Sequence, residues 1–255
     1  MPATTDASKG HSGRTFILVH GAWHGGWCWR DICKPLENMG HRVFTPTLTG
    51  LADRKHLLSA QVGLSTHIAD ITNLIDQHDL KEITLVGHSY GGMVITGVAD
   101  ALKERLRHIV YLDAALPKDG QSMITQGPER SPDILANTEQ GLRALAADGI
   151  AMSSLLPEML GIPEDHPSYD WVSQNMSPHP LKSWLDPIDL PNGGSNGLSR
   201  TYIHCTDPVL QNASFAWHAE QVQANEQWQY HALETGHEAM ITAPAELLSI
   251  LTNIN

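Results

Sequence analysis

The most informative stretch of this sequence is Ile83-Thr-Leu-Val-Gly-His-Ser-Tyr-Gly-Gly-Met93. Its apolar, partly β-branched start predicts a buried strand, and the residues from Met93 to Leu102 have helical spacing. Between them, residues 87–91 fit the pattern G-x-S-x-G, which is typical of a nucleophile elbow. In that turn a strained backbone lifts the serine hydroxyl above the sheet, at the N-terminus of the next helix. Glycine is expected at both ends of the pattern because a Cβ would crowd the adjoining strand or helix. Ser89 is therefore the predicted nucleophile.

Length and charge limit what else the protein can be. A chain of 255 residues can form one substantial core. The formal charge of −12, from 16 basic and 28 acidic residues, argues against nucleic acid or an anionic membrane as the partner. No apolar run approaches membrane-spanning length. Residues 1–13 are small, polar and mixed in charge, without the apolar core of a signal peptide, so we expect a disordered N-terminus on a cytoplasmic protein.

Cysteine and histidine patterns give no sign of a metal centre. The three cysteines have no zinc spacing and are expected to be free thiols in a reducing compartment. The 15 histidines include no H-E-x-x-H or similar ligand pattern. We therefore expect neither a metal nor a disulfide.

Strand and helix patterns alternate along the chain. Strands are predicted at 15–19, 42–45, 83–86, 108–112, 200–204 and 227–231, with helices at 27–38, 66–77, 93–102, 215–222 and 244–254. Ser65 is the expected N-cap of the helix at 66–77. This alternation predicts an α/β fold with a mainly parallel sheet that helices cover on both faces.

The segment 116–199 differs in composition. It holds ten prolines together with several Met and Trp residues, and it is too long for an ordinary connection. We expect a helical lid or cap inserted into a core made of residues 14–115 and 200–255. Met152, Leu156 and Trp184 are predicted to contact substrate, although apolar residues of a lid can equally form the lid's own core.

Three residues in the chain order Ser, acid, His are expected to form a catalytic triad. A serine hydroxyl needs a base, and the base needs a carboxylate that fixes its tautomer. His237 is the predicted base because it lies in a glycine-containing turn after the last strand. Asp207 directly follows a strand and is the favoured acid; Asp113, which also ends a strand, is the competitor. Glu238 is expected to be solvated.

Two backbone N–H groups should bind the oxyanion. One belongs to Tyr90, the residue after the nucleophile, and the other is expected from the loop after the first strand. Ala22 is the favoured residue in that loop. Trp23 or His24 is predicted to touch substrate.

With these residues identified, the chain resembles the plant methylesterase and hydroxynitrile lyase branch of the α/β-hydrolases, and its bacterial esterases more closely. The resemblance is carried by Phe16-Ile-Leu-Val-His-Gly-Ala-Trp-His-Gly-Gly-Trp-Cys-Trp29, Gly87-His-Ser-Tyr-Gly-Gly92, Cys205-Thr-Asp207 and Gly236-His237. The stretches Thr45–Ser59 and Met93–Asp100 are similar to bacterial hydrolases of the benzimidazole carbamate carbendazim. The likeness is weak within the lid.

The resemblance implies the triad Ser89, Asp207 and His237, an oxyanion hole from Ala22 and Tyr90, and no cofactor. Lyase members of the branch carry a lysine directly after the catalytic histidine and a threonine in the first oxyanion loop. Here those positions are Glu238 and Ala22. A glutamate would oppose a leaving cyanide, so the sequence favours ester hydrolysis.

We therefore expect a carboxylesterase of class EC 3.1.1 that cleaves a small, largely apolar or aromatic ester through an acyl-enzyme. A carbamate hydrolase with the same triad is the near alternative. A hydroxynitrile lyase, a cofactor-free oxygenase and a non-catalytic small-molecule receptor are the other classes that this fold supports. The expected partner is a small-molecule ester, and a homodimer is left open.

Overall fold

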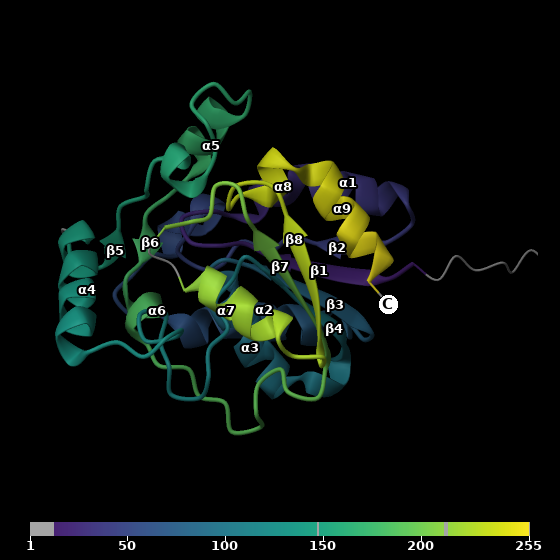
Figure 1. The fold of residues 1–255 in the computed structure, drawn as a ribbon, viewed down its shortest axis with the longest axis horizontal. Coiled ribbons are helices and arrows are strands. Elements are labelled where there is room, and N and C mark those ends of the chain that lie inside the picture. The colour runs from purple at the N-terminus through teal and green to yellow at the C-terminus, as the bar shows by residue number, and fades with distance from the viewer. Residues whose placement is uncertain (1–12, 147, 212–213, 255) are drawn as a thin grey trace, which may run out of the picture.

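A six-stranded parallel sheet forms the centre of the computed structural model, which describes residues 13–146, 148–211 and 214–254 (Figure 1). Its strands lie in the order β2-β1-β3-β4-β7-β8 and every neighbouring pair is parallel. The strands are β1 (Thr15–Val19), β2 (Arg42–Phe44), β3 (Ile83–His88), β4 (Leu106–Leu112), β7 (Ser199–Cys205) and β8 (Trp228–Leu233). The elbow strand β3 is central, so the residues that follow it lie in the middle of the carboxyl edge of the sheet.

Helices cover both faces of this sheet, as the alternation of strands and helices predicted. One face packs against α1 (Arg30–Asn38), α8 (Ala239–Thr242) and α9 (Pro244–Asn253). The other packs against α2 (Leu64–Gln77), α3 (Gly91–Ala101) and α7 (Phe215–Gln223). Within β1, Phe16 and Leu18 join the first cluster and Ile17 and Val19 join the second. Because successive side chains of a strand point to opposite faces, a strand buried on both sides is apolar throughout. The α/β-hydrolase fold class is confirmed.

Short elements fill the long connection between β4 and β7. They are α4 (Pro132–Leu145), β5 (Ala151–Met152), the 3₁₀ turn η4 (Pro157–Leu160), α5 (Tyr169–Asn175), β6 (His179–Pro180) and α6 (Lys182–Leu185). β5 and β6 pair as a separate antiparallel ladder. In Figure 1 these elements lie together beside the sheet. We call residues 116–199 the lid segment; its function as a lid and its boundaries stay a prediction.

Three further 3₁₀ turns complete the description: η1 (Gly26–Trp29), η2 (Ala52–Leu57) and η3 (Lys103–Arg105). No helix in the described ranges is long and apolar enough to cross a membrane. The predicted disordered N-terminus lies outside the described residues, apart from Gly13.

The start of α2 differs from the prediction. The helix begins at Leu64, with Gly63 and not Ser65 as its N-cap. The Leu64 N–H donates to Asp186 Oδ2 at 3.2 Å, and the Gly63 N–H donates to the Thr66 hydroxyl at 3.3 Å. A carboxylate 122 residues away thus satisfies a free N–H of the first turn, which no local capping rule can anticipate.

Candidate active site

The elbow has the strained geometry that the sequence predicted. Ser89 has a φ of 54°, in the left-handed region that non-glycine residues rarely adopt. A Cβ on Gly91 would lie 2.9 Å from His20 O, and one on Gly87 would lie 2.7 Å from Ile95 Cδ1. The expectation that side chains at these two positions would crowd their neighbours is confirmed.

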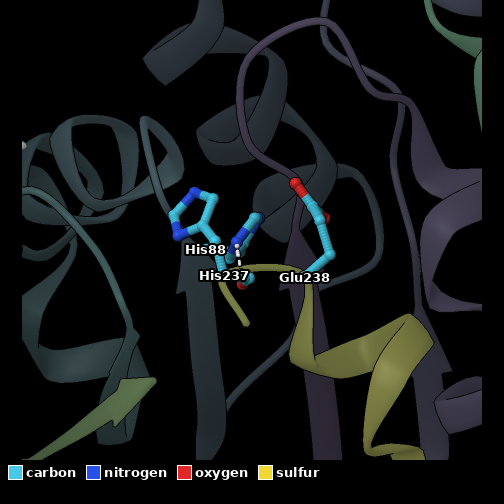
Figure 2. A group of neighbouring side chains, drawn as sticks. All are labelled: His88, His237 and Glu238. Carbon is cyan, nitrogen blue, oxygen red and sulfur yellow. Dashed lines mark hydrogen bonds between the residues drawn. The ribbon is translucent and has the colours of Figure 1, made fainter. Parts of the chain in front are cut away.

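His88, the residue before Ser89, ties the elbow to the turn that carries His237. Its Nε2–H donates to the backbone oxygen of His237 at 3.0 Å, and the two rings are 4.4 Å apart (Figure 2). Burial lowers the pKa of His88 well below 6.5, so its ring stays neutral. His88, His237 and Glu238 each offer an atom with which they could ligate a metal ion, all within 4.8 Å of one another. A metal ion bound there would coordinate the His237 ring, the same ring that would have to accept a proton as a base.

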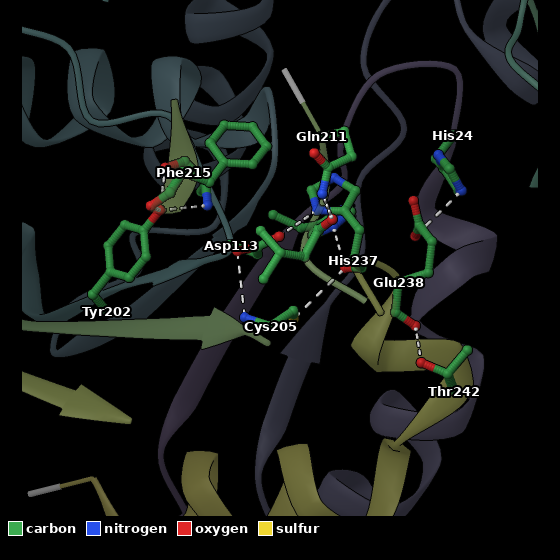
Figure 3. Close-up of polar contacts among 12 residues, drawn as sticks. His24, Asp113, Tyr202, Cys205, Gln211, Phe215, His237, Glu238 and Thr242 are labelled. Atoms are coloured by element: carbon green, nitrogen blue, oxygen red, sulfur yellow. Dashed lines mark hydrogen bonds and ion pairs between the residues drawn. The ribbon is translucent and has the colours of Figure 1, made fainter. Parts of the chain in front are cut away.

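His237 is paired with Asp113 and not with Asp207. Asp113 Oδ2 lies 2.6 Å from His237 Nδ1, both residues are buried, and Asp113 Oδ1 accepts the Cys205 N–H at 3.3 Å (Figure 3). The side chain of Asp207 is exposed, and its backbone N–H donates to Thr235 O at 3.1 Å. The sequence-based preference for Asp207 as the partner of His237 is therefore corrected to Asp113, the competitor.

The positions of the two aspartates in the sheet explain this outcome. Asp113 follows β4, which pairs directly with the elbow strand β3, and its φ of 39° marks a sharp turn there. Its N–H donates to Ile203 O at 2.7 Å, which fixes the residue between β4 and β7. Asp207 lies two residues beyond β7, in a segment that runs alongside the end of β8 through the bond from Thr206 N–H to Leu233 O at 2.9 Å. Both aspartates follow a strand in the sequence, and only the packing shows which of them reaches His237.

The charge around His237 favours its protonated form. Burial alone would lower the pKa of His237, but the hydrogen bond that its Nδ1–H donates to Asp113 and the negative charges of Asp113 and Glu238 outweigh that effect and raise the pKa above 6.5. With Nδ1–H donated to Asp113, Nε2 is the nitrogen that can accept a proton. Ser89 and His237 line the same cavity.

The predicted oxyanion donors lie in two well-packed turns. Ala22 is buried in the loop after β1, and Tyr90 precedes α3. A Cβ on Gly21 would lie 2.8 Å from Ser89 Cβ, so the loop packs directly against Ser89. Neither the Ala22 N–H nor the Tyr90 N–H donates to an acceptor within the described part of the chain. Both groups have the free donor that an oxyanion hole needs.

A cavity of about 610 Å³ opens onto Ser89 and His237. Trp23 and Trp184, both predicted to contact substrate, line it. Phe215 also lines it and stacks on the His237 ring, with centroids 5.4 Å apart and planes 10° from parallel. The other apolar lining residues include Met123, Ile124, Leu155, Met159, Leu160 and Leu210.

Three predicted substrate contacts lie elsewhere. Met152 is fully buried in a small cluster with Ala146 and Leu181, which is the lid's own core. Leu156 is exposed and does not line the cavity. His24 is buried in the loop after β1, where its Nδ1 contacts the backbone oxygen of Ala22 at 2.7 Å. The geometry does not place these side chains against a substrate.

Glu238, predicted to be solvated, is 1% exposed. Its Oε2 lies 3.5 Å from His24 Nε2 (Figure 3). A carboxylate can be buried this way when a cationic or hydrogen-bonding partner faces it. Residues that the sequence reasoning missed are Phe215 and the lid residue His179, whose local patterns gave no signal of a role near the nucleophile.

Comparison with known proteins shows the family to which this chain belongs. The sequence model described as the Alpha/beta hydrolase family matches residues 16–250. A carbendazim hydrolyzing esterase of Nocardioides sp. (strain SG-4G) is 40% identical over 238 residues, which cover 91% of this chain and 96% of that protein. Methylesterase 10 of Arabidopsis thaliana is 26% identical, covering 94% of this chain and 90% of that one. A solved extracellular alpha/beta-hydrolase from a Paenibacillus species superposes with a TM-score of 0.80 at 24% identity, covering 95% and 99% of the two chains. The chain therefore belongs to the alpha/beta hydrolase family, in the branch of the plant methylesterases and hydroxynitrile lyases.

Proposed function

We propose that this protein is a serine carboxylesterase that hydrolyses small, largely apolar or aromatic esters through an acyl-enzyme. The observation that carries the proposal is the buried pair of His237 and Asp113, in which His237 lines the same cavity as the strained Ser89. The similarity to a carbendazim hydrolyzing esterase over 91% of the chain supports the same reaction class.

Five residues take part in the proposed reaction. Ser89 Oγ attacks the ester carbonyl while His237 Nε2 takes its proton. Asp113 holds Nδ1–H and stabilises the imidazolium. The N–H groups of Ala22 and Tyr90 bind the oxyanion of the tetrahedral intermediate. His237 then protonates the leaving alcohol and activates the water that releases the acid.

The cavity supports an apolar substrate. Its polar side chains are partly engaged by the protein: Arg130 donates to the backbone oxygens of Ile124 and Gln126 at 2.7 and 3.1 Å, and Glu158 accepts from the Tyr169 hydroxyl at 2.5 Å. A charged substrate group would lose its water in exchange for few free partners, which is costly.

A carbamate is the second candidate substrate class, because a relative at 40% identity is a carbendazim hydrolyzing esterase. A carbamate carbonyl can be attacked by the same serine and bound by the same N–H pair. The two classes differ in the departing group and in the fit of the ring system to the cavity.

The position of Glu238 changes the argument against cyanohydrin lyase activity. Glu238 faces His24 and does not line the cavity, so its carboxylate does not confront a departing cyanide directly. The argument rests instead on the absence of a lysine at position 238, next to the base.

The proposal is tested with wild type and Ser89→Ala on a panel of p-nitrophenyl acetate, alkyl and aryl esters, a methyl benzimidazole carbamate and mandelonitrile. Alanine fits the elbow, so the variant should fold, and the loss of a triad member should lower kcat on the order of 10⁴- to 10⁶-fold. Ester turnover that survives in a clean Ser89→Ala preparation contradicts the mechanism. Cyanide release matching ester hydrolysis points to a lyase, and binding without any turnover points to a receptor.

A further inference from the structure

Two consecutive peptide groups of the loop at residues 20–24, here called the oxyanion loop, are held by buried histidine rings. His20 Nδ1 lies 2.8 Å from Gly21 O, and His24 Nδ1 lies 2.7 Å from Ala22 O. Both acceptors are carbonyls, so each ring carries a proton on Nδ1. For His20 this tautomer also fits its other nitrogen, which accepts the Leu48 N–H at 3.0 Å.

A third histidine, from the lid segment, binds the other end of the second peptide. The Trp23 N–H donates to His179 Nδ1 at 3.3 Å. The Ala22 carbonyl and the Trp23 N–H belong to one peptide group, so His24 and His179 fix both of its polar atoms. The lid holds the next group too, because the Ser177 N–H donates to Trp23 O at 2.9 Å.

The hydrogen bonds of His179 leave it a single consistent tautomer. Its Nε2–H donates to the Ser183 hydroxyl at 2.8 Å, and that hydroxyl donates to Pro180 O at 2.8 Å. His179 is fully buried, and burial lowers its pKa well below 6.5, so Nδ1 keeps the lone pair that accepts from Trp23. The same ring packs edge-on against Tyr90, with centroids 4.7 Å apart. His179 therefore contacts Tyr90, which is one proposed oxyanion donor, and Trp23, which follows the other donor, Ala22.

The backbone held in this way is strained. Trp23 has a φ of 65°, a conformation that is unfavourable for a bulky residue and persists only where its surroundings impose it. A relaxed Trp23 would rotate the Ala22–Trp23 peptide and release the Cα of Ala22, which this peptide shares with the Gly21–Ala22 peptide. The Gly21–Ala22 peptide carries the Ala22 N–H, and His20 holds its carbonyl. Hydrogen bonds at both ends of the peptide oppose that rotation.

We propose that His179 and His24 are positioning residues for the oxyanion hole: they anchor the peptide that follows Ala22, next to the one that carries the Ala22 N–H and that His20 holds, and His179 makes this anchoring depend on the lid segment. This inference rests on the proposed esterase function. His24 links the same peptide to the turn of the base, because Glu238 Oε2 faces its Nε2 at 3.5 Å. The hole is thus assembled from the loop after β1, the lid and the residue that follows His237.

The test compares His179→Leu and His24→Leu with His179→Asn and His24→Asn. An Asn amide places an acceptor or a donor close to the position of Nδ1, whereas Leu keeps bulk without either. We expect each Leu variant to lower kcat roughly tenfold to a hundredfold, below the 10²- to 10³-fold loss of a whole oxyanion donor, with KM within about twofold of wild type. The Asn variants should recover most of that loss.

A second readout separates positioning from general damage. A trifluoromethyl ketone forms a hemiketal oxyanion with Ser89, so its Ki should rise in the Leu variants by the same factor as kcat falls. The double variant His24→Leu/His179→Leu should cost little more than the worse single variant, because both act on one peptide. If a Leu variant does not fold, the test compares kcat of His179→Asn with kcat of His179→Gln. Asn places its amide near the position of Nδ1, whereas Gln places it near Nε2.

Unchanged kcat in the Leu variants, or equal kcat in His179→Asn and His179→Gln, overturns the inference. So does a kcat loss that leaves the Ki of the ketone unchanged. Ser89→Ala is measured alongside: turnover that persists in this variant removes the esterase proposal itself. A dead Ser89→Ala with fully active Leu variants removes only the role of the histidines.

Discussion

The 2.6 Å contact between His237 Nδ1 and Asp113 Oδ2 joins the turn after β8 to the end of β4, across β7. The carboxylate therefore comes from the strand beside the nucleophile's own strand. Asp207, one strand further from Ser89, is left exposed. This arrangement makes the two aspartates separable by experiment.

Asp113→Asn should lower kcat by roughly 10⁴-fold, because an amide in this place favours the wrong tautomer of His237. Asp207→Asn changes an exposed side chain and should leave kcat near the wild-type value, with stability within about 0.5 kcal/mol. Steady-state kinetics with p-nitrophenyl acetate and thermal unfolding of both variants check this. The opposite ranking of the two variants would restore Asp207 as the acid.

The pH dependence should show the raised pKa of His237. The base works only when neutral, so kcat/KM should fall as the pH drops through a value above 6.5. Glu238→Gln removes a negative charge that stabilises the imidazolium, so the acid limb should move to lower pH. Profiles of kcat/KM from about pH 5 to pH 9 measure this. A limb that moves to higher pH in Glu238→Gln would contradict the electrostatic assignment.

Gly161 tests the contact between the lid segment and the turn of the base. It has a φ of 85°, and a Cβ there would lie 2.9 Å from Gly236 Cα and 3.0 Å from His237 N. Gly161→Ala should displace this turn and lower kcat roughly tenfold or more, since small misplacements of a catalytic group are costly.

Gly120→Ala is the matched control for Gly161→Ala. Its φ of 75° carries the same backbone strain, but a Cβ there would meet nothing within 4 Å. The backbone strain should cost both variants about 1–2 kcal/mol of stability, to which Gly161→Ala adds the cost of its clash, and only Gly161→Ala should lose activity. Equal kcat losses would show that strain, and not contact with the catalytic turn, is responsible.

Chain length should control specificity in an apolar cavity. Each buried methylene contributes about 0.8 kcal/mol, so kcat/KM should rise roughly fourfold per CH₂ until the cavity is full. Trp184→Ala enlarges the cavity and should move the optimum to longer chains. Met152→Leu, in the lid's own core, should leave the optimum unchanged. A best substrate that is charged, or an optimum shifted by Met152→Leu, would count against this view of the pocket.

The sequence by itself determined those features of this protein that depend on short-range interactions along the chain. The G-x-S-x-G turn needs glycines on both sides of a strained serine, and the elements before and after it follow from short-range periodicity. The alternation of strands and helices then leaves few arrangements other than a parallel sheet covered on both faces. The strained turn at Ser89 and the fold class could be predicted for these reasons.

Contacts between residues far apart in the chain determined the carboxylate partner of His237, the cap of α2 and the pocket walls. Asp113 and Asp207 each follow a strand, and only the order of the strands brings the first of them to His237. Met152 and Trp184 both belong to the lid segment and pack in the same small cluster, yet only Trp184 also lines the cavity. Periodicity reports which residues are buried, but not which surface buries them. The pairing of His237 with Asp113, and the three histidines around the oxyanion loop, were decided by tertiary packing because their partners lie up to 156 residues apart.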